Sequence, residues 1–131
     1  MVWPVPEINE DNEAFWTGGR NGRLMISRCD DCGYRTHPPT PRCPSCFGER
    51  VAPSPVRGRG RVYSFTINRR AWMPDLEVPY VIAVVELDEQ PGLRLLTNVI
   101  GCPVDRVAID MPVQVDFVER GAAFAPVFRA A

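Results

Sequence analysis

The fold is decided by two short cysteine motifs, Cys29-Asp30-Asp31-Cys32 and Cys43-Pro44-Ser45-Cys46, which ten residues separate. Each motif can place two thiolates on one tight turn, and two such turns facing each other make the tetrahedral cage of four sulfurs that zinc favours. Gly33 follows the first motif directly, where the turn needs a residue that tolerates a positive φ. The pattern therefore predicts one structural zinc ion, held by Cys29, Cys32, Cys43 and Cys46.

Other uses of these cysteines remain open, namely two disulfides, free redox thiols or an iron site. Disulfides require an oxidising compartment, and residues 1–20 have neither the basic start nor the apolar run of a secretion signal. No apolar run approaches the ~18 residues of a membrane span, so we expect a cytoplasmic protein. Residues 29–34 resemble a rubredoxin turn, which suggests iron, but the short gap between the motifs favours zinc.

The remaining composition offers no catalytic set. His37 is the single histidine and the chain has no lysine, which excludes Schiff-base chemistry and a phosphate-binding lysine loop. His37 could replace a cysteine as a metal ligand, but four thiolates already fill the cage. Cys102, in a Gly-Cys-Pro sequence, is interpreted as a turn residue. We therefore expect no catalytic residue and no turnover by this chain alone.

The 131 residues divide into three expected parts. These are an N-terminal helical segment over 1–20, a zinc ribbon over 21–52 and an all-β domain over 53–131. The ribbon is expected to begin with a short strand in which Leu24, Ile26 and Arg28 occupy alternate positions before the first cysteine turn. Because a module of this size cannot build an adequate apolar core, metal binding must supply much of its folding free energy.

The N-terminal helix is expected to run from Asn9, its cap, to about Gly18. Ile8, Phe15 and Trp16 recur at helical spacing and form one apolar edge. A helix of about ten residues is not stable alone in water. This edge must therefore dock, either on the chain's own body or on another protein.

The all-β domain is expected to hold five strands, over residues 61–67, 80–87, 93–100, 113–118 and 124–128. Five short strands in about 75 residues predict a mainly β chain ending in a closed barrel of the OB type. Tyr63 and Phe65 alternate onto one face of the first strand and are expected in the core. Residues 80–87 form a nearly continuous apolar run, as in a strand that is covered on both faces.

Taken together, these stretches resemble the DUF35 family. The resemblance is carried by residues 15–18, 22–24, 28–33, 38–39, 43–46, 58–66, 79–87 and 109–113. It covers almost the whole chain, with one departure at Asp110, where the family often has glycine before the methionine of a turn. The resemblance implies a rubredoxin-like zinc ribbon followed by an OB-fold domain.

The resemblance also implies an accessory role. Such proteins form hetero-oligomers with a larger acyl-CoA enzyme, stabilise it and help to form the channel for CoA or substrate. The implied partner is a thiolase-superfamily enzyme, such as the lipid-transfer-protein-like aldolases of steroid side-chain degradation, or a MaoC-type enoyl-CoA hydratase. A CoA ester would then be the substrate of the complex rather than of this chain.

Two sets of residues are predicted contacts. The first set suits the phosphates of CoA, because a guanidinium group gives two parallel, charge-assisted bonds; it comprises Arg57, Arg59, Arg69 and Arg70. The second set is aromatic and is expected at the partner interface; it comprises Phe15, Trp16 and Trp72. The alternative for the arginines is that they are solvated strand and loop residues.

Nucleic-acid binding is the rival class of function, since OB barrels and zinc ribbons both support it. The formal net charge of −1 gives no global attraction to phosphates. Aromatic residues are also not interleaved with the arginines as a stacking platform requires. We therefore do not expect nucleic acid as the partner.

Overall fold

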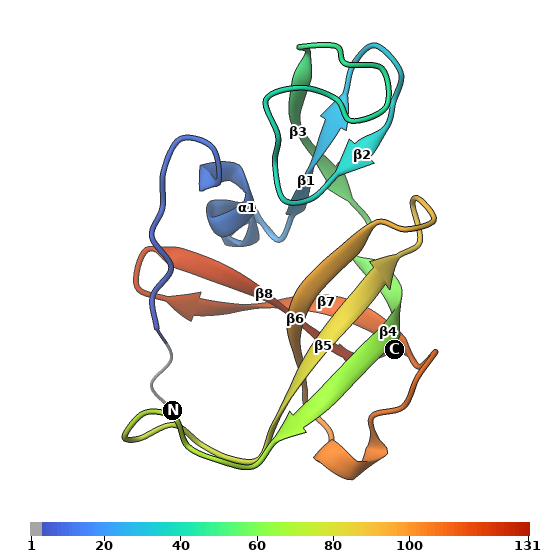
Figure 1. Ribbon diagram of the computed structural model, residues 1–131. Helices are drawn as coiled ribbons and strands as arrows, with labels where there is room; N and C mark the ends of the chain where they lie inside the picture. Colours follow the sequence, from blue (N-terminus) through green and yellow to red (C-terminus); the bar gives the residue numbers. More distant parts are fainter. Residues whose placement is uncertain (1–3) are drawn as a thin grey trace.

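The computed structural model describes residues 4–131 and confirms a mainly β chain with one short N-terminal helix, a zinc ribbon and an OB-fold sheet (Figure 1). The ribbon stands at one end of the barrel, and the helix lies beside the hairpin formed by the last two strands. Within the described residues, no helix is long and apolar enough to cross a membrane.

The barrel consists of β4 (Arg59–Asn68), β5 (Tyr80–Leu87), β6 (Arg94–Ile100), β7 (Pro112–Arg120) and β8 (Ala123–Ala130). The strand order is β4-β5-β6-β8-β7, and β7 pairs with β4 to close the sheet. All neighbours are antiparallel except β6 and β8, which pair in parallel over only two residues of each strand. This closed order of five strands confirms the predicted OB barrel.

A β-bulge in β4 changes the face of the strand that enters the core. Between Val62 and Ser64 the pairing with β5 shifts register, and the inward positions move from Gly60 and Val62 to Phe65. A bulge adds one residue to one strand and so reverses the alternation beyond it. The prediction of a buried Tyr63 is wrong, since its side chain is 49% exposed.

Strand β5 has one face in the barrel and one face outside. Val81, Ala83, Val85 and Leu87 are buried, and the residues between them are half-buried. The predicted bounds of this strand match those of the structure. Its continuous apolar run therefore provides an apolar outer surface as well as part of the core.

The N-terminal helix is shorter than predicted, because α1 covers only Glu13–Thr17. The Asn9 side chain bonds locally instead of capping the helix, since its Oδ1 accepts the N–H groups of Asp11 at 2.9 Å and Asn12 at 3.0 Å. Side chains of this type commonly stabilise turns in this way. At the other end, a 3-10 turn, η1 (Gly18–Asn21), follows the helix where a stop at Gly18 was expected.

The ribbon is a three-stranded antiparallel sheet of β1 (Leu24–Cys29), β2 (Arg35–Thr36) and β3 (Val51–Val56), with β1 in the centre. Strand β3 continues into β4 after a sharp bend at Gly58, whose φ is +75°. A Cβ atom at Gly58 would lie 2.2 Å from the Val115 side chain. Only glycine fits both constraints, so this bend fixes how the ribbon leads into the barrel.

One apolar core connects the three parts of the chain. Leu24 and Ile26 of the ribbon and Phe15 of α1 belong to the same buried cluster as the barrel residues Val62 and Phe128. Burial of apolar surface is the main favourable contribution to folding. The stability of the ribbon and that of the barrel are therefore coupled.

Candidate metal centre and partner surfaces

The four predicted cysteine ligands meet at one point of the ribbon. Their sulfur atoms all lie within 4.8 Å of one another. The Cys29 and Cys46 sulfurs are 3.6 Å apart, and those of Cys32 and Cys43 are 3.5 Å apart. Tetrahedral coordination with Zn–S bonds of about 2.3 Å requires sulfurs about 3.8 Å apart. The residues present therefore fit a structural zinc ion.

The two cysteine turns are built by the same hydrogen bonds. The N–H of Cys29 donates to the carbonyl of Tyr34, and the carbonyl of Cys29 accepts the N–H of Gly33. In the second turn the N–H of Cys43 donates to the carbonyl of Gly48, and the carbonyl of Cys43 accepts the N–H of Phe47. The two turns are thus equivalent, as expected of a symmetric cage with no open position.

The turns differ at the residue with a positive φ. Gly33 has a φ of +79°, which confirms the predicted reason for glycine there, whereas the equivalent Phe47 has a φ of +63°. A bulky residue in this region is strained. The Phe47 side chain is also 72% exposed, so packing within the described chain does not compensate for the strain.

Backbone N–H groups favour the thiolate form at one of the four sulfurs, that of Cys43. The N–H of Cys46 lowers the pKa of the Cys43 thiol to about 7, and the N–H of Ser45 acts in the same direction. A thiolate is the form that binds a metal. The two turns are also joined by an ion pair between Arg50 and Asp31, in which the Arg50 Nε donates to the carboxylate at 2.9 Å.

The single histidine is not part of the cage. His37 packs on Phe15 with a distance of 4.7 Å between ring centroids, and it lines a surface cavity of about 400 Å³ together with Trp16 and Leu96. Burial lowers the pKa of His37 below its ordinary value. His37 is therefore neutral near pH 7 and acts as a packing residue between α1, the ribbon and the barrel.

The four predicted CoA-binding arginines lie at opposite ends of one strand. Arg59 begins β4, whereas Arg69 and Arg70 follow its last residue. Ten residues of extended strand span about 30 Å, so the two pairs cannot bind one phosphate group together. The Nε of Arg57 is 3.7 Å from the Glu89 carboxylate, which partly neutralises its charge.

The predicted aromatic contacts lie in three different environments. Phe15 is buried in the core, and Trp16 is half-buried with its ring 4.9 Å from that of Phe15. Trp72 is 68% exposed in the loop between β4 and β5, where the Arg70 guanidinium lies 5.1 Å from the indole centroid. Phe15 thus docks on the chain's own body, while Trp16 and Trp72 remain accessible.

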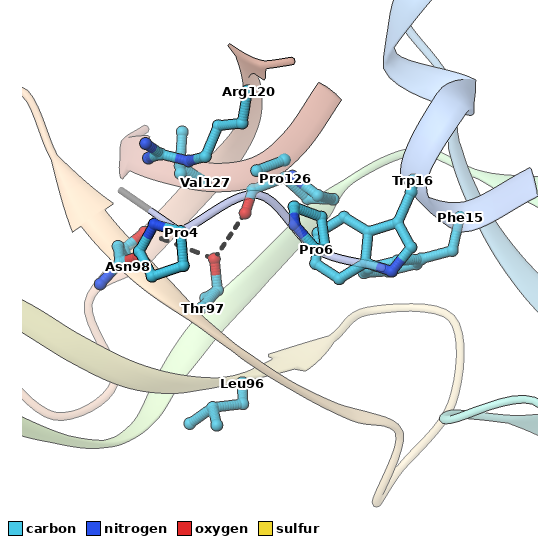
Figure 2. Close-up of a pocket in the computed structure, with 11 residues that line it drawn as sticks. Pro4, Pro6, Phe15, Trp16, Leu96, Thr97, Asn98, Arg120, Pro126 and Val127 are labelled. Carbon is cyan, nitrogen blue, oxygen red and sulfur yellow. Dashed lines mark hydrogen bonds between the residues drawn. The ribbon is translucent and has the colours of Figure 1, made fainter. Parts of the chain in front are cut away.

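Trp16 also closes one end of a cavity of about 320 Å³ between β6 and β8 (Figure 2). These strands pair only near their ends, and elsewhere Thr97 bridges them by donating its hydroxyl proton to the Pro126 carbonyl at 3.0 Å. Pro4 and Pro6 cross the opening in Figure 2. The gap in the barrel wall is therefore partly covered by the N-terminal segment.

Sequence reasoning missed an apolar patch on the outer face of β5 and β6. Leu96 is 71% exposed and pairs in register with the half-buried Val84. On the same face the Arg94 guanidinium lies 3.7 Å from the centroid of the exposed Tyr63 ring. The apolar run of residues 80–87 was the available signal, but it did not show which side chains would face outward.

Comparison with known proteins finds family models that match both the ribbon and the barrel. The family model "ChsH2, rubredoxin-like zinc ribbon domain" matches residues 16–52, and "ChsH2, C-terminal OB-fold domain" matches residues 54–118. A solved structure titled "Ltp2-ChsH2(DUF35) aldolase" is 39% identical, with a TM-score of 0.85, and the match covers 96% of this chain and 98% of that one. This chain belongs to the DUF35 family. The DUF35 assignment agrees with the zinc cage and with the closed order of the barrel strands.

Two curated relatives of this DUF35 chain are named as hydratase subunits. The probable enoyl-CoA hydratase alpha subunit of Thermomonospora curvata is 40% identical over 129 residues, which are 98% of this chain. The 3-oxo-4,17-pregnadiene-20-carboxyl-CoA hydratase alpha subunit of Mycobacterium tuberculosis is 36% identical over 117 residues, or 87% of this chain. The present chain spans only 40% and 36% of the lengths of these relatives.

Proposed function

We propose that this chain is a non-catalytic accessory subunit of an acyl-CoA-processing enzyme, whose larger subunit is a thiolase-superfamily aldolase of the lipid-transfer-protein-like kind. The match to the Ltp2-ChsH2(DUF35) aldolase carries this proposal, because it covers 98% of that chain at a TM-score of 0.85. A steroid side-chain CoA ester is the proposed substrate of the complex, since one relative is named for a pregnadiene-carboxyl-CoA.

The proposed role of the chain is to stabilise the larger subunit and to complete its substrate channel. The exposed apolar side chains of Leu96 and Trp72 and the half-buried indole of Trp16 support this role. Exposed apolar patches on small proteins commonly mark interfaces. Four thiols that serve as metal ligands persist best in a reducing compartment, so we place the complex in the cytoplasm.

For the CoA moiety we propose contacts with Arg69 and Arg70 in the loop between β4 and β5. Both side chains are exposed beside Trp72, whose indole could cover the adenine. Arg57 is the weaker candidate because of the nearby Glu89 carboxylate, and Arg59 lies at the same distant end of β4.

A MaoC-type enoyl-CoA hydratase is the second candidate for the larger subunit. The names of the two curated relatives favour it, although those proteins are more than twice as long as this chain. Such relatives can carry further domains, so their names describe more than the part matched here. The aldolase is preferred because its matching chain has nearly the same extent as this one.

Co-expression with each class of larger subunit tests the proposal. We expect this chain to co-purify with the aldolase, and retro-aldol cleavage of a steroid side-chain CoA ester to require both proteins. Turnover by the isolated chain would contradict the accessory role. Co-purification with a hydratase and no aldolase would select the second candidate.

A further inference from the structure

The most exposed large apolar side chain among residues 4–131 belongs to the second cysteine turn. This side chain is the ring of Phe47, which is 72% exposed. Strand β1 runs from the shared core at Leu24 to Cys29, so the cysteine turns lie at the end of the ribbon that points away from the barrel (Figure 1). The ring therefore projects from the free end of the ribbon.

The backbone of this residue is strained, although a turn of this kind does not require strain. In the first turn glycine occupies the position with a positive φ, Gly33, and the aromatic Tyr34 comes one place later. In the second turn the order is reversed, with Phe47 at a φ of +63° and Gly48 after it. A Cβ atom at Gly48 would lie 2.7 Å from the Asp31 carboxylate. This close approach accounts for the glycine at position 48 but not for the phenylalanine before it.

Strain at a bulky residue persists where other interactions compensate for it. Among residues 4–131 the ring of Phe47 has no aromatic or cation–π partner and little packing. Aromatic side chains that become buried on association are common anchors of protein interfaces. We propose that the Phe47 ring is such an anchor and inserts into an apolar pocket of the larger subunit. The identity of that subunit rests on the proposed accessory function, whereas the strain and the exposure belong to this chain.

The charged groups around the anchor favour a protein pocket over a nucleic acid or an anionic membrane. Arg42 donates to the backbone carbonyl of the anchor residue at 3.4 Å and is paired with Glu49. Arg50 is paired with Asp31. The exposed Asp30 forms no ion pair with any of the residues that the structure describes. This end of the ribbon therefore has surplus negative charge, which repels phosphates and matches an apolar pocket with a basic rim.

Fluorine magnetic resonance of the zinc-loaded full chain tests the position of the ring directly. 4-Fluorophenylalanine in place of Phe47 reports contact with solvent through the difference in its fluorine shift between H2O and D2O. We expect this difference to be large in the free chain and to fall by at least half in the complex with the larger aldolase subunit. The same label in place of the buried Phe128 gives the value for a ring without solvent contact.

Matched variants separate the ring from the strain of its backbone. Phe47→Gly removes both, so it should raise the melting temperature of the free chain and yet weaken association at least tenfold. Phe47→Ala removes the ring and keeps a side chain at the positive φ, so it should weaken association to the same extent without the gain in stability. Ile109→Ala shortens an exposed apolar side chain between β6 and β7 and should leave association unchanged.

A second pair of variants tests the expected basic rim of the pocket. Asp30→Asn should weaken association about threefold and leave the zinc content unchanged. Asp105→Asn makes the same change of net charge in the 3-10 turn η2 (Val104–Arg106) and should have no effect on association. Equal effects of the two variants, or tighter association of Asp30→Asn, would show that the rim is not basic and would overturn this part of the inference.

Three results would overturn the anchor itself. These are normal assembly of Phe47→Ala, a fluorine label that stays in contact with solvent in the complex, and an equal loss of affinity in Ile109→Ala. Dimerisation of the isolated chain that Phe47→Ala abolishes would assign the ring to a second copy and would also overturn it. If the unmodified chain assembles with no larger subunit, the proposed function falls and the inference falls with it. If only the Phe47→Ala result is contrary, the inference falls alone.

Discussion

The Gln90 side chain binds the backbone of Arg35 on both sides of the residue and thereby joins the barrel to the ribbon. Its Oε1 accepts the Arg35 N–H at 2.9 Å, and its Nε2 donates to the Arg35 carbonyl at 2.8 Å. Gln90 lies at the tip between β5 and β6, and Arg35 begins β2. The amide thus occupies the place of an additional strand residue at the edge of the ribbon sheet.

We expect Gln90→Ala to destabilise the chain by about 1–2 kcal/mol, because two partly buried hydrogen bonds are lost. Gln90→Glu should have an intermediate effect, since the carboxylate keeps the acceptor and loses the donor. Denaturant unfolding gives the stability, and hydrogen exchange at Arg35 N–H reports the contact. Unchanged exchange in Gln90→Ala would contradict the role of this pair.

Removal of the metal is expected to affect more than the ribbon. Cys43→Ser should abolish stoichiometric zinc binding, as measured by elemental analysis, and should unfold the ribbon. Because Leu24 and Ile26 share the buried cluster of the barrel, we also expect a lower melting temperature for the barrel. A variant that retains zinc and full stability would contradict the four-cysteine cage, and a red, iron-containing protein would favour the rubredoxin alternative.

Strain at the second cysteine turn gives a paired prediction. Phe47→Gly should stabilise the ribbon by up to about 1 kcal/mol, since glycine adopts a positive φ without the steric cost of a side chain. Gly33→Ala at the equivalent position should destabilise it by a similar amount. Thermal unfolding of the zinc-loaded proteins measures both. If Phe47→Gly were instead less stable, the exposed ring would have a stabilising contact in solution.

Features of the chain that depend on local spacing could be predicted from sequence. The ligand set Cys29, Cys32, Cys43 and Cys46 is of this kind, because each pair sits within one turn. Strand β5 is another, because its apolar run ends at polar and proline-rich boundaries. The family resemblance extended these local signals to the whole OB barrel.

Features that depend on distant partners could not be predicted. The bulge at Tyr63 is a mismatch in register with β5, and the alternation of apolar and polar residues within β4 does not predict it. The separation of Arg59 from Arg69 is different, because it follows from the single strand that was expected between them. The cavity at His37 could not be predicted from local patterns, because it needs α1, the ribbon and the barrel to meet.

The stability of the chain should depend on pH through His37. Burial holds the pKa of folded His37 below its ordinary value of 6.5, so the unfolded chain binds the proton more readily. This contribution is complete above about pH 6.5 and is lost as pH falls towards the folded pKa, by at most about 1.4 kcal/mol per pH unit. Acid also removes zinc from both proteins, so the test compares the free energy of unfolding of the unmodified chain with that of His37→Phe at each pH. The variant should lose less stability between pH 6.5 and 5. If the free energies of unfolding of the two proteins fall in parallel, the prediction is wrong.

Trp72 offers the cleanest test of the partner surface, because its exposed side chain contributes little to the fold. Burial of an aromatic anchor at an interface commonly contributes about 2 kcal/mol or more. Trp72→Ala should therefore weaken association with the larger subunit at least tenfold, while zinc content and unfolding stay near those of the unmodified chain.

Trp16→Ala should also weaken association, but it should destabilise the chain as well, since Trp16 packs on Phe15. Leu96→Ser removes the apolar patch on β6 without disturbing the core and serves as the matched variant. If Trp72→Ala assembles normally while Leu96→Ser does not, the interface lies on the outer face of β5 and β6. If both assemble normally with every candidate subunit, neither surface is the interface.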